Sequence, residues 1–199
     1  MREMLSNEKE YNENSWQKVI IKFIQVLFPK YVFVGNKPNF KTIQGEKKQP
    51  DFIIGDADGY VDIIEIKIPF TTGVLSARKS QKYRDNYIPL RELSGAVMQC
   101  EKYIFNMTSN MKDVLKELNS QYKSTVPRNY EFKIVNPKAM IIMGRSNDFS
   151  EDQKKDFEII KRKYKNIIDI ITYDDLLHRL ETTISILENQ NEFEKSSSM

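Results

Sequence analysis

The feature that most constrains the fold is a hairpin pattern over residues 49–67, with the sequence QPDFIIGDADGYVDIIEIK. Two short apolar runs flank an Asp-Gly pair, a dipeptide that is typical of tight turns between antiparallel strands. The second run is apolar on both faces except at Glu65 and Lys67. Because alternate residues of a strand point the same way, these two side chains share a face with Val61 and Ile63.

A carboxylate and an ammonium group in a mostly buried strand are costly unless each finds a partner. Asp51, at the entry to the first strand, brings a second carboxylate toward the same place. Pro50-Asp51 and Glu65-Ile66-Lys67 together resemble the two halves of the PD-(D/E)xK nuclease signature. The alternative is an ordinary hairpin with charges at its edge, since these residue types are common and the gap between the halves varies.

The chemistry of a metal-dependent nuclease explains these residue types. Mg²⁺ prefers oxygen ligands and takes one or two carboxylates together with several waters. We therefore expect Asp51 and Glu65 to hold Mg²⁺, with Mn²⁺ able to substitute. Lys67 can orient or deprotonate the attacking water, or neutralise charge that develops on the phosphate.

Composition excludes several other chemistries. The 199 residues fit one domain, and 40% apolar with 30% charged residues indicate a soluble globular protein. Cys100 is the only cysteine and His178 the only histidine, which argues against disulfides, cysteine or histidine zinc sites and serine-histidine hydrolases. We expect Cys100 to pack in a helix and His178 to lie on the surface. No signal peptide or membrane span is apparent, so a cytoplasmic protein is expected.

Positive charge is clustered although the net charge is only +3. Cations lie on both sides of the motif hairpin, where a phosphate backbone would be bound. The alternative is that they are solvated residues of loops and helix faces. The candidate DNA-contacting cations are Lys48, Arg78, Lys79, Lys82 and Arg84.

Periodicity predicts one domain over residues 13–189, between a polar segment at 1–12 and a disordered tail at 190–199. The expected elements are a helix at 16–28, strands at 31–34, 52–54 and 61–68, a long helix from Pro89 to about Tyr122, a strand at 139–143, a helix after a capping box at 150–153, a strand at 167–171 and a helix after Thr172. This order predicts an α/β protein with the αβββαβ core of the restriction-endonuclease-like fold and a C-terminal α-β-α extension.

Two helices contribute further candidates. Glu13 lies at the N-terminal end of the inward stripe of the first helix, with Glu10 as the alternative acidic residue. The competing explanation is that negative charge is favoured at a helix N-terminus. Gln99 and Tyr103 are four residues apart on the long helix and therefore adjacent. The amide can hold a water, the lysine or a phosphate, and the tyrosine can contact DNA or brace Gln99.

The chain as a whole resembles the nuclease domain of Shedu anti-phage defence proteins. The segments that carry the resemblance are Glu13-x-x-Trp16-Gln17, Gln49-Pro50-Asp51-Phe52, Ile64-Glu65-Ile66-Lys67, Gln99-x-x-x-Tyr103 and the late segment ITYDDLL at 171–177. The resemblance implies a metal-dependent DNA endonuclease that acts on double-stranded DNA and forms a homo-oligomer, such as a tetramer. It assigns catalytic roles to Asp51, Glu65, Lys67, Gln99 and Glu13.

Many Shedu proteins carry a sensor domain in front of the nuclease, whereas almost nothing precedes Glu13 here. We therefore expect a minimal member, an excised domain, or a protein that relies on a separate sensor. Two other functions stay open at this point. One is a non-cleaving nucleic-acid-binding or scaffold module on the same fold, and the other is a conventional restriction endonuclease with a fixed target sequence.

Overall fold

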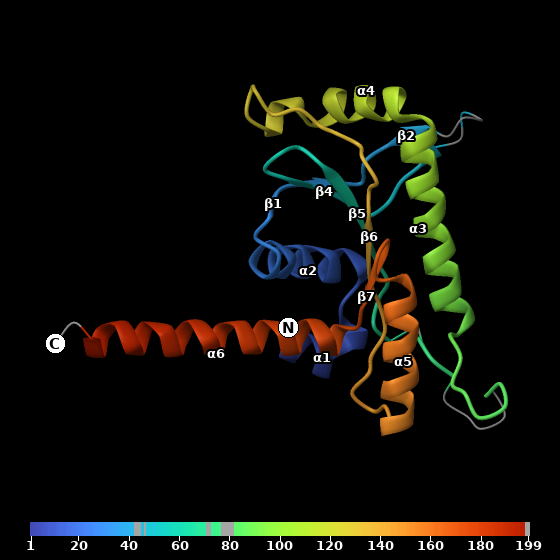
Figure 1. Cartoon of the computed structure of the whole chain (residues 1–199), viewed down its shortest axis with the longest axis vertical. Helices are drawn as coiled ribbons and strands as arrows, with labels where there is room; N and C mark the ends of the chain where they lie inside the picture. Colours follow the sequence, from blue (N-terminus) through green and yellow to red (C-terminus); the bar gives the residue numbers. More distant parts are fainter. Residues whose placement is uncertain (42–44, 46, 71–72, 77–81, 198–199) are drawn as a thin grey trace.

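The structure is a computed structural model, and it describes residues 1–41, 45, 47–70, 73–76 and 82–197. Within these residues the protein is of mixed α/β class, with helices on both faces of a five-stranded sheet (Figure 1). The helices are α1 (Arg2–Ser6), α2 (Glu13–Leu27), α3 (Arg91–Ser109), α4 (Met111–Tyr122), α5 (Glu151–Tyr164) and α6 (Tyr173–Ser197), with 3-10 turns η1 (Glu8–Glu10) and η3 (Lys123–Thr125). The strands of the main sheet are β1 (Tyr31–Asn36), β4 (Phe52–Asp56), β5 (Val61–Ile66), β6 (Ala139–Ile142) and β7 (Ile168–Ile171).

The sheet has the strand order β1-β4-β5-β6-β7. The first three strands are antiparallel, and β6 and β7 extend β5 in parallel. A separate two-stranded ribbon pairs β2 (Phe40–Lys41) with β3 (Lys47–Lys48). The expected sequence of helix, three strands, helix and strand is thus observed, as are the following helix, parallel strand and helix.

The turn between β4 and β5 forms as its sequence predicts. The carboxylate of Asp56 accepts hydrogen bonds from the backbone N–H groups of Asp58 and Tyr60. Gly59 has a φ of 91°, in the left-handed region that favours glycine. A Cβ at Gly59 would lie 1.9 Å from the carbonyl oxygen of Glu131. This turn fixes the register in which Phe52 pairs with Ile64, so the next residues along, Asp51 and Glu65, come opposite one another.

The sheet separates two hydrophobic cores. On the face covered by α3, α4 and α5, alternate strand residues such as Ile53 and Ile63 pack with Cys100 and Phe157. On the opposite face, Ile64 and its neighbours pack against α2 and the start of α6 (Figure 1). Cys100 is buried and His178 is exposed, as the sequence predicts.

The predicted long helix is wrong in two respects. It begins at Arg91 after an N-cap at Leu90, so that Pro89 lies before it and forms a β-bridge with Leu75. It also breaks at Asn110, whose φ of −120° and ψ of 36° are not helical. The Asn110 side-chain amide donates to the carbonyl of Lys41 in β2, which anchors the break. Helix α4 therefore crosses the end of α3 (Figure 1).

The structure also has helices near both ends of the chain. Residues 2–6 form α1, with Met4 and Leu5 buried, so the N-terminal segment is more than a polar extension. Helix α6 extends to Ser197, and the disorder expected for residues 190–199 stays a prediction. No helix in the described part of the chain is long and apolar enough to cross a membrane.

Candidate active site

The two halves of the motif meet where β4 begins and β5 ends. Asp51 precedes β4, and its Oδ2 accepts a hydrogen bond of 2.7 Å from the backbone N–H of Ile66. Its Oδ1 accepts a hydrogen bond of 2.9 Å from the side-chain amide of Gln17 in α2. Both oxygens of the carboxylate are thus oriented by neighbouring elements, which keeps Asp51 beside the end of β5.

Glu65 and Lys67 form an ion pair within this site. Lys67 Nζ lies 2.5 Å from Glu65 Oε1. The residue Glu65 is only 3% exposed, and its Oε2 is buried with no hydrogen-bond partner among the described residues. A buried carboxylate oxygen without a donor carries a desolvation cost of about 1–3 kcal/mol or more, so this atom is suited to an additional cationic ligand.

The electrostatics of the site reflect two carboxylates confined together. Burial raises the pKa of Glu65, and the nearby charge of Asp51 raises it further. Burial also raises the pKa of Asp51, with a smaller upward contribution from Glu13. For Lys67, burial acts to lower the pKa, but the hydrogen bond and charge of Glu65 outweigh it, so the pKa is raised. Lys67 is therefore a cation at neutral pH.

The residues present fit a magnesium ion with few protein ligands. Within the described ranges, no group of three or more His, Cys, Asp or Glu side chains gathers in a way that could hold a metal. Two carboxylates are nevertheless sufficient for Mg²⁺, which keeps several of its waters. Asp51 and Glu65 supply them, and each carboxylate oxygen can accept more than one contact. The unpartnered Oε2 of Glu65 is the observation that supports this fit.

Helix α3 completes the surroundings of Lys67. The Oε1 of Gln99 accepts a hydrogen bond of 3.2 Å from Lys67 Nζ. The amide nitrogen of Gln99 donates to the hydroxyl of Tyr103 at 2.8 Å, and that hydroxyl donates to the carbonyl of Gln49 at 3.2 Å. Tyr103 is buried. Of the two roles expected for Tyr103, the geometry matches bracing of Gln99.

Glu13 joins the site indirectly. The side-chain amide of Gln17 donates to Glu13 at 3.0 Å as well as to Asp51. Glu13 is exposed and begins α2, whereas Glu10 lies before it in η1. Of the two acidic candidates, the structure therefore connects Glu13 to the carboxylate pair.

Gln17 was given no role from the sequence, although it is 4% exposed and contacts two of the predicted acids. The available signal was a polar residue at a buried position, four residues after Glu13 on the same helical face. A buried amide requires hydrogen-bond partners, and the nearby motif carboxylates are natural ones.

Local contacts are described for two of the candidate DNA-contacting cations, Lys82 and Arg84. Lys82 places its Nζ 3.8 Å from the ring centroid of Tyr87. Arg84, with a φ of 56°, lies in a tight turn closed by hydrogen bonds between Tyr83 and Asn86. Lys48 belongs to β3, but its side chain is outside the described part of the structure. The predictions for Arg78 and Lys79 also fall outside the described residues.

Comparison with known proteins identifies one family. The sequence model of the family described as "Shedu protein SduA, C-terminal" matches residues 10–177. The Shedu protein SduA of Bacillus cereus (strain B4264) is 26% identical over 189 residues, which cover 88% of this chain and 44% of that relative. The chain thus spans less than half the length of this relative. The residues matched by the family model include the whole candidate site.

Proposed function

The chain belongs to the Shedu protein family, and we propose that it is a metal-dependent DNA endonuclease of bacterial anti-phage defence. The observation that carries the proposal is the buried, unpartnered Oε2 of Glu65, next to the ion-paired Lys67 and opposite Asp51. Burying two carboxylates and an ammonium group together carries a desolvation cost that a purely structural hairpin does not require. The same arrangement is suited to a site that binds a divalent cation.

The order of the elements supports the fold that such an enzyme requires. Helix α2, strands β1, β4 and β5, helix α3 and strand β6 occur in this order in the chain, with the β2–β3 ribbon inserted after β1 and helix α4 inserted after α3. Apart from these insertions, the order is the one expected for an αβββαβ core of the PD-(D/E)xK type, which supports the proposal. We therefore propose a restriction-endonuclease-like fold with α5, β7 and α6 as its extension.

In this proposal Asp51 and Glu65 hold Mg²⁺, and Mn²⁺ can replace it. Bound Mg²⁺ would polarise the scissile phosphodiester and lower the pKa of a coordinated water. Asp51 is oriented for binding by Gln17 and by the backbone of Ile66. Glu65 offers its Oε2, which has no hydrogen-bond partner in the part of the chain that the structure describes.

In the metal-free site Lys67 is a positive charge, and with the metal bound it can orient or deprotonate the attacking water. Its pKa is raised by Glu65 against the effect of burial, so the ammonium form persists at neutral pH. That form can orient the attacking water and neutralise negative charge on the phosphate. Gln99 holds the ammonium group from the side of α3, and Tyr103 fixes the orientation of Gln99.

The substrate and the assembly follow from the family resemblance. We propose double-stranded DNA as the substrate, a homo-oligomer such as a tetramer as the active form, and recognition of infection by a separate sensor domain or protein. Lys48, Arg78, Lys79, Lys82 and Arg84 are the cations proposed to contact the phosphate backbone.

The test is incubation of the purified protein with supercoiled, nicked and linear DNA in the presence and absence of Mg²⁺ or Mn²⁺. Wild type should cut only with metal, and Lys67→Ala should lose this activity. Lys138→Ala removes an exposed lysine before β6 and should cut as wild type does. Metal-dependent DNA binding without any cleavage would favour the scaffold alternative, and cutting at one fixed sequence would favour a conventional restriction enzyme.

A further inference from the structure

The late segment ITYDDLL packs directly against the candidate site. Its tyrosine, Tyr173, begins α6 and is fully buried. The hydroxyl of Tyr173 donates a hydrogen bond of 3.0 Å to the backbone carbonyl of Lys67. We infer that Tyr173 is a positioning residue that holds the main chain of Lys67 so that its ammonium group stays in the site, an inference that rests on the proposed function.

The main chain needs such support at this point because Lys67 lies one residue beyond the end of β5. Its N–H donates to the carbonyl of Ile142 at the end of β6, and its carbonyl accepts from Tyr173. Two residues later, Pro69 has no N–H with which to continue a ladder. The peptide group before the Lys67 side chain is therefore held by β6, and the peptide group after it by α6.

The ring of Tyr173 also links this support to the other half of the motif. It packs edge-on against Trp16, with ring centroids 5.0 Å apart and an interplanar angle of 77°. Trp16 is fully buried in α2 and directly precedes Gln17, whose amide orients Asp51. One residue at the start of α6 thus contacts the main chain of Lys67 and the helix that orients Asp51.

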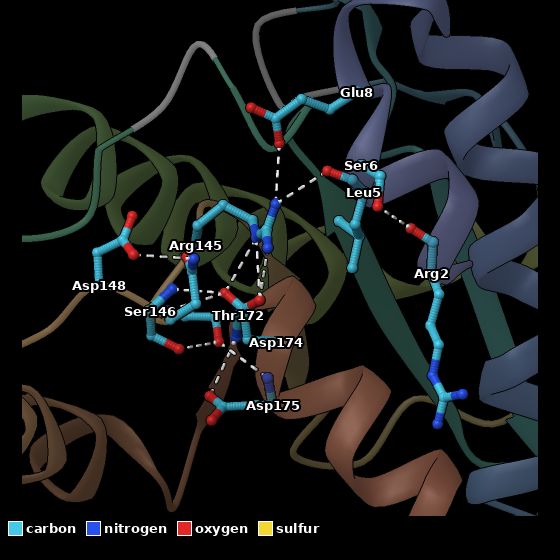
Figure 2. A network of polar contacts seen from close by, with 11 residues as sticks. Arg2, Leu5, Ser6, Glu8, Arg145, Ser146, Asp148, Thr172, Asp174 and Asp175 are labelled. Atoms are coloured by element: carbon cyan, nitrogen blue, oxygen red, sulfur yellow. Dashed lines mark hydrogen bonds and ion pairs between the residues drawn. The ribbon is translucent and has the colours of Figure 1, made fainter.

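The first turn of α6 is itself fastened by a polar network (Figure 2). The carboxylate of Asp174 accepts hydrogen bonds from the guanidinium of Arg145 and from the backbone N–H groups of Ser146 and Asn147. Thr172 caps the turn, because its hydroxyl accepts from the N–H of Asp175. These contacts tie the turn that carries Tyr173 to the loop after β6.

Arg145 extends the same network to the N-terminal segment. Its Nη1 lies 3.1 Å from Glu8 Oε2 and donates to the carbonyl of Leu5 at 3.4 Å. Figure 2 shows the guanidinium placed between Asp174 on one side and Glu8 on the other. Arg145 therefore holds α1, η1 and the start of α6 together, and Tyr173 is presented from a turn that is fixed on several sides.

The matched variants are Tyr173→Phe and Tyr130→Phe. Each removes one tyrosine hydroxyl that donates to a backbone carbonyl, and Tyr130 donates to Asp56 at 2.8 Å in the turn at the far end of β4. Cleavage kinetics with Mg²⁺, hydrogen exchange of the backbone amides and thermal unfolding are measured for both and for wild type. If the Tyr173 hydroxyl had only a structural role, the two variants should lose similar thermal stability. Neither variant should then change kcat or the exchange of the Lys67 amide selectively.

For Tyr173→Phe we expect kcat to fall by about tenfold or more while the KM for DNA stays within about twofold, because small misplacements of a catalytic group are costly. The Lys67 N–H keeps its own bond to Ile142, but a Lys67 carbonyl that Tyr173 no longer holds should let this segment open more easily, so we expect the Lys67 amide to exchange about fivefold faster through local opening. Tyr130→Phe should leave kcat and the exchange of the Lys67 amide unchanged. An unchanged exchange rate at Lys67 in Tyr173→Phe overturns the inference, as does an unchanged kcat in an active enzyme.

If wild type cuts no DNA under any condition, the proposed function fails, and the exchange rate alone decides whether Tyr173 holds Lys67. If Tyr173→Phe does not fold, Arg145→Gln takes its place, because it loosens the turn that carries Tyr173 without altering that residue. The same two changes, in kcat and in exchange at Lys67, are then expected to a smaller extent. If a folded Arg145→Gln protein has the wild-type kcat and the wild-type exchange rate at Lys67, the inference is overturned.

Discussion

Asp51 accepts a hydrogen bond of 2.7 Å from the backbone N–H of Ile66, which fastens the first half of the motif to the strand that carries the second. The bond bridges residues that are far apart in the motif but adjacent across the β4–β5 hairpin. It explains how Asp51, which lies before β4, is held opposite Glu65. The proposed metal site therefore depends on the hairpin register as much as on the acidic side chains.

Removal of either carboxylate should weaken metal binding. We expect Asp51→Asn and Glu65→Gln each to weaken Mg²⁺ binding by about tenfold or more, because Mg²⁺ is held by only one or two protein carboxylates. Isothermal titration calorimetry measures the affinity. Asp58→Asn, which changes an exposed carboxylate in the hairpin turn, is the control and should bind as wild type does. Equal affinity in all four proteins would place the ion elsewhere.

Gln17 should matter although it carries no charge. Gln17→Ala removes the amide that donates to both Glu13 and Asp51. We expect a loss of about 1–3 kcal/mol in the free energy of unfolding, since a buried acceptor loses its donor, together with weaker Mg²⁺ binding. Gln25→Ala changes an exposed residue of the same helix and should alter neither property. Urea denaturation and calorimetry test both expectations, and an unchanged Mg²⁺ affinity in Gln17→Ala would contradict the role of Gln17.

Stability should depend on pH through the two site carboxylates. Burial and mutual charge raise the pKa of Asp51 and of Glu65. An acid with a raised pKa stabilises the fold below its unfolded pKa, and this contribution is lost as the pH rises through the folded pKa. Without metal, wild type should therefore lose stability relative to Glu65→Gln as the pH rises above about 4, near the ordinary pKa of a carboxyl group.

Urea denaturation across the pH range measures this difference. Glu65→Gln should be the more stable protein at neutral pH without metal, and the gap should close in acid. Saturating Mg²⁺ should stabilise wild type and leave Glu65→Gln unchanged, because a ligand stabilises only the state that binds it. Glu131→Gln, which changes an exposed carboxylate, serves as the control. If the difference in unfolding free energy between wild type and Glu65→Gln did not vary with pH, this would contradict a raised pKa of Glu65 in the folded protein.

Two glycines provide a test of the hairpin. Gly59→Ala would place a Cβ 1.9 Å from the carbonyl of Glu131 at a φ of 91°, so it should destabilise the protein by more than about 1–3 kcal/mol. Gly95→Ala adds a methyl group to α3 with no atom within 4 Å and should stabilise by about 1 kcal/mol. Thermal unfolding of both variants gives the comparison. Equal effects would contradict the observed packing of the turn against residue 131.

The sequence predicted that Lys67 and Gln99 lie close together, but it did not predict the contacts of Gln17 and Tyr173 that orient the candidate site. The two-residue spacing of Glu65 and Lys67 and the four-residue spacing of Gln99 and Tyr103 place these side chains on known faces of a strand and a helix, and the structure brings Lys67 and Gln99 together. The hairpin turn was equally predictable, because Asp-Gly has a specific backbone preference. Local periodicity is sufficient for such relationships.

Other features depend on contacts between distant segments. At the break at Asn110 the side-chain amide donates a hydrogen bond to the distant Lys41, while the apolar stripe continues through the break without a change of period. The roles of Gln17 and Tyr173 arise from α2 and α6 packing on the same face of the sheet. No pattern within either helix specifies the partner, and so the sequence alone did not assign them.

The most direct test is to locate the ion. Crystals grown with Mn²⁺, which Mg²⁺ sites accept, would show the metal by its anomalous scattering. We predict one strong anomalous peak within coordination distance, about 2.0–2.3 Å, of both Asp51 and Glu65, and its loss in Glu65→Gln. An ion bound elsewhere, or no ion at a saturating Mn²⁺ concentration in a protein that still cuts DNA, would contradict the metal site on which the proposed function is built.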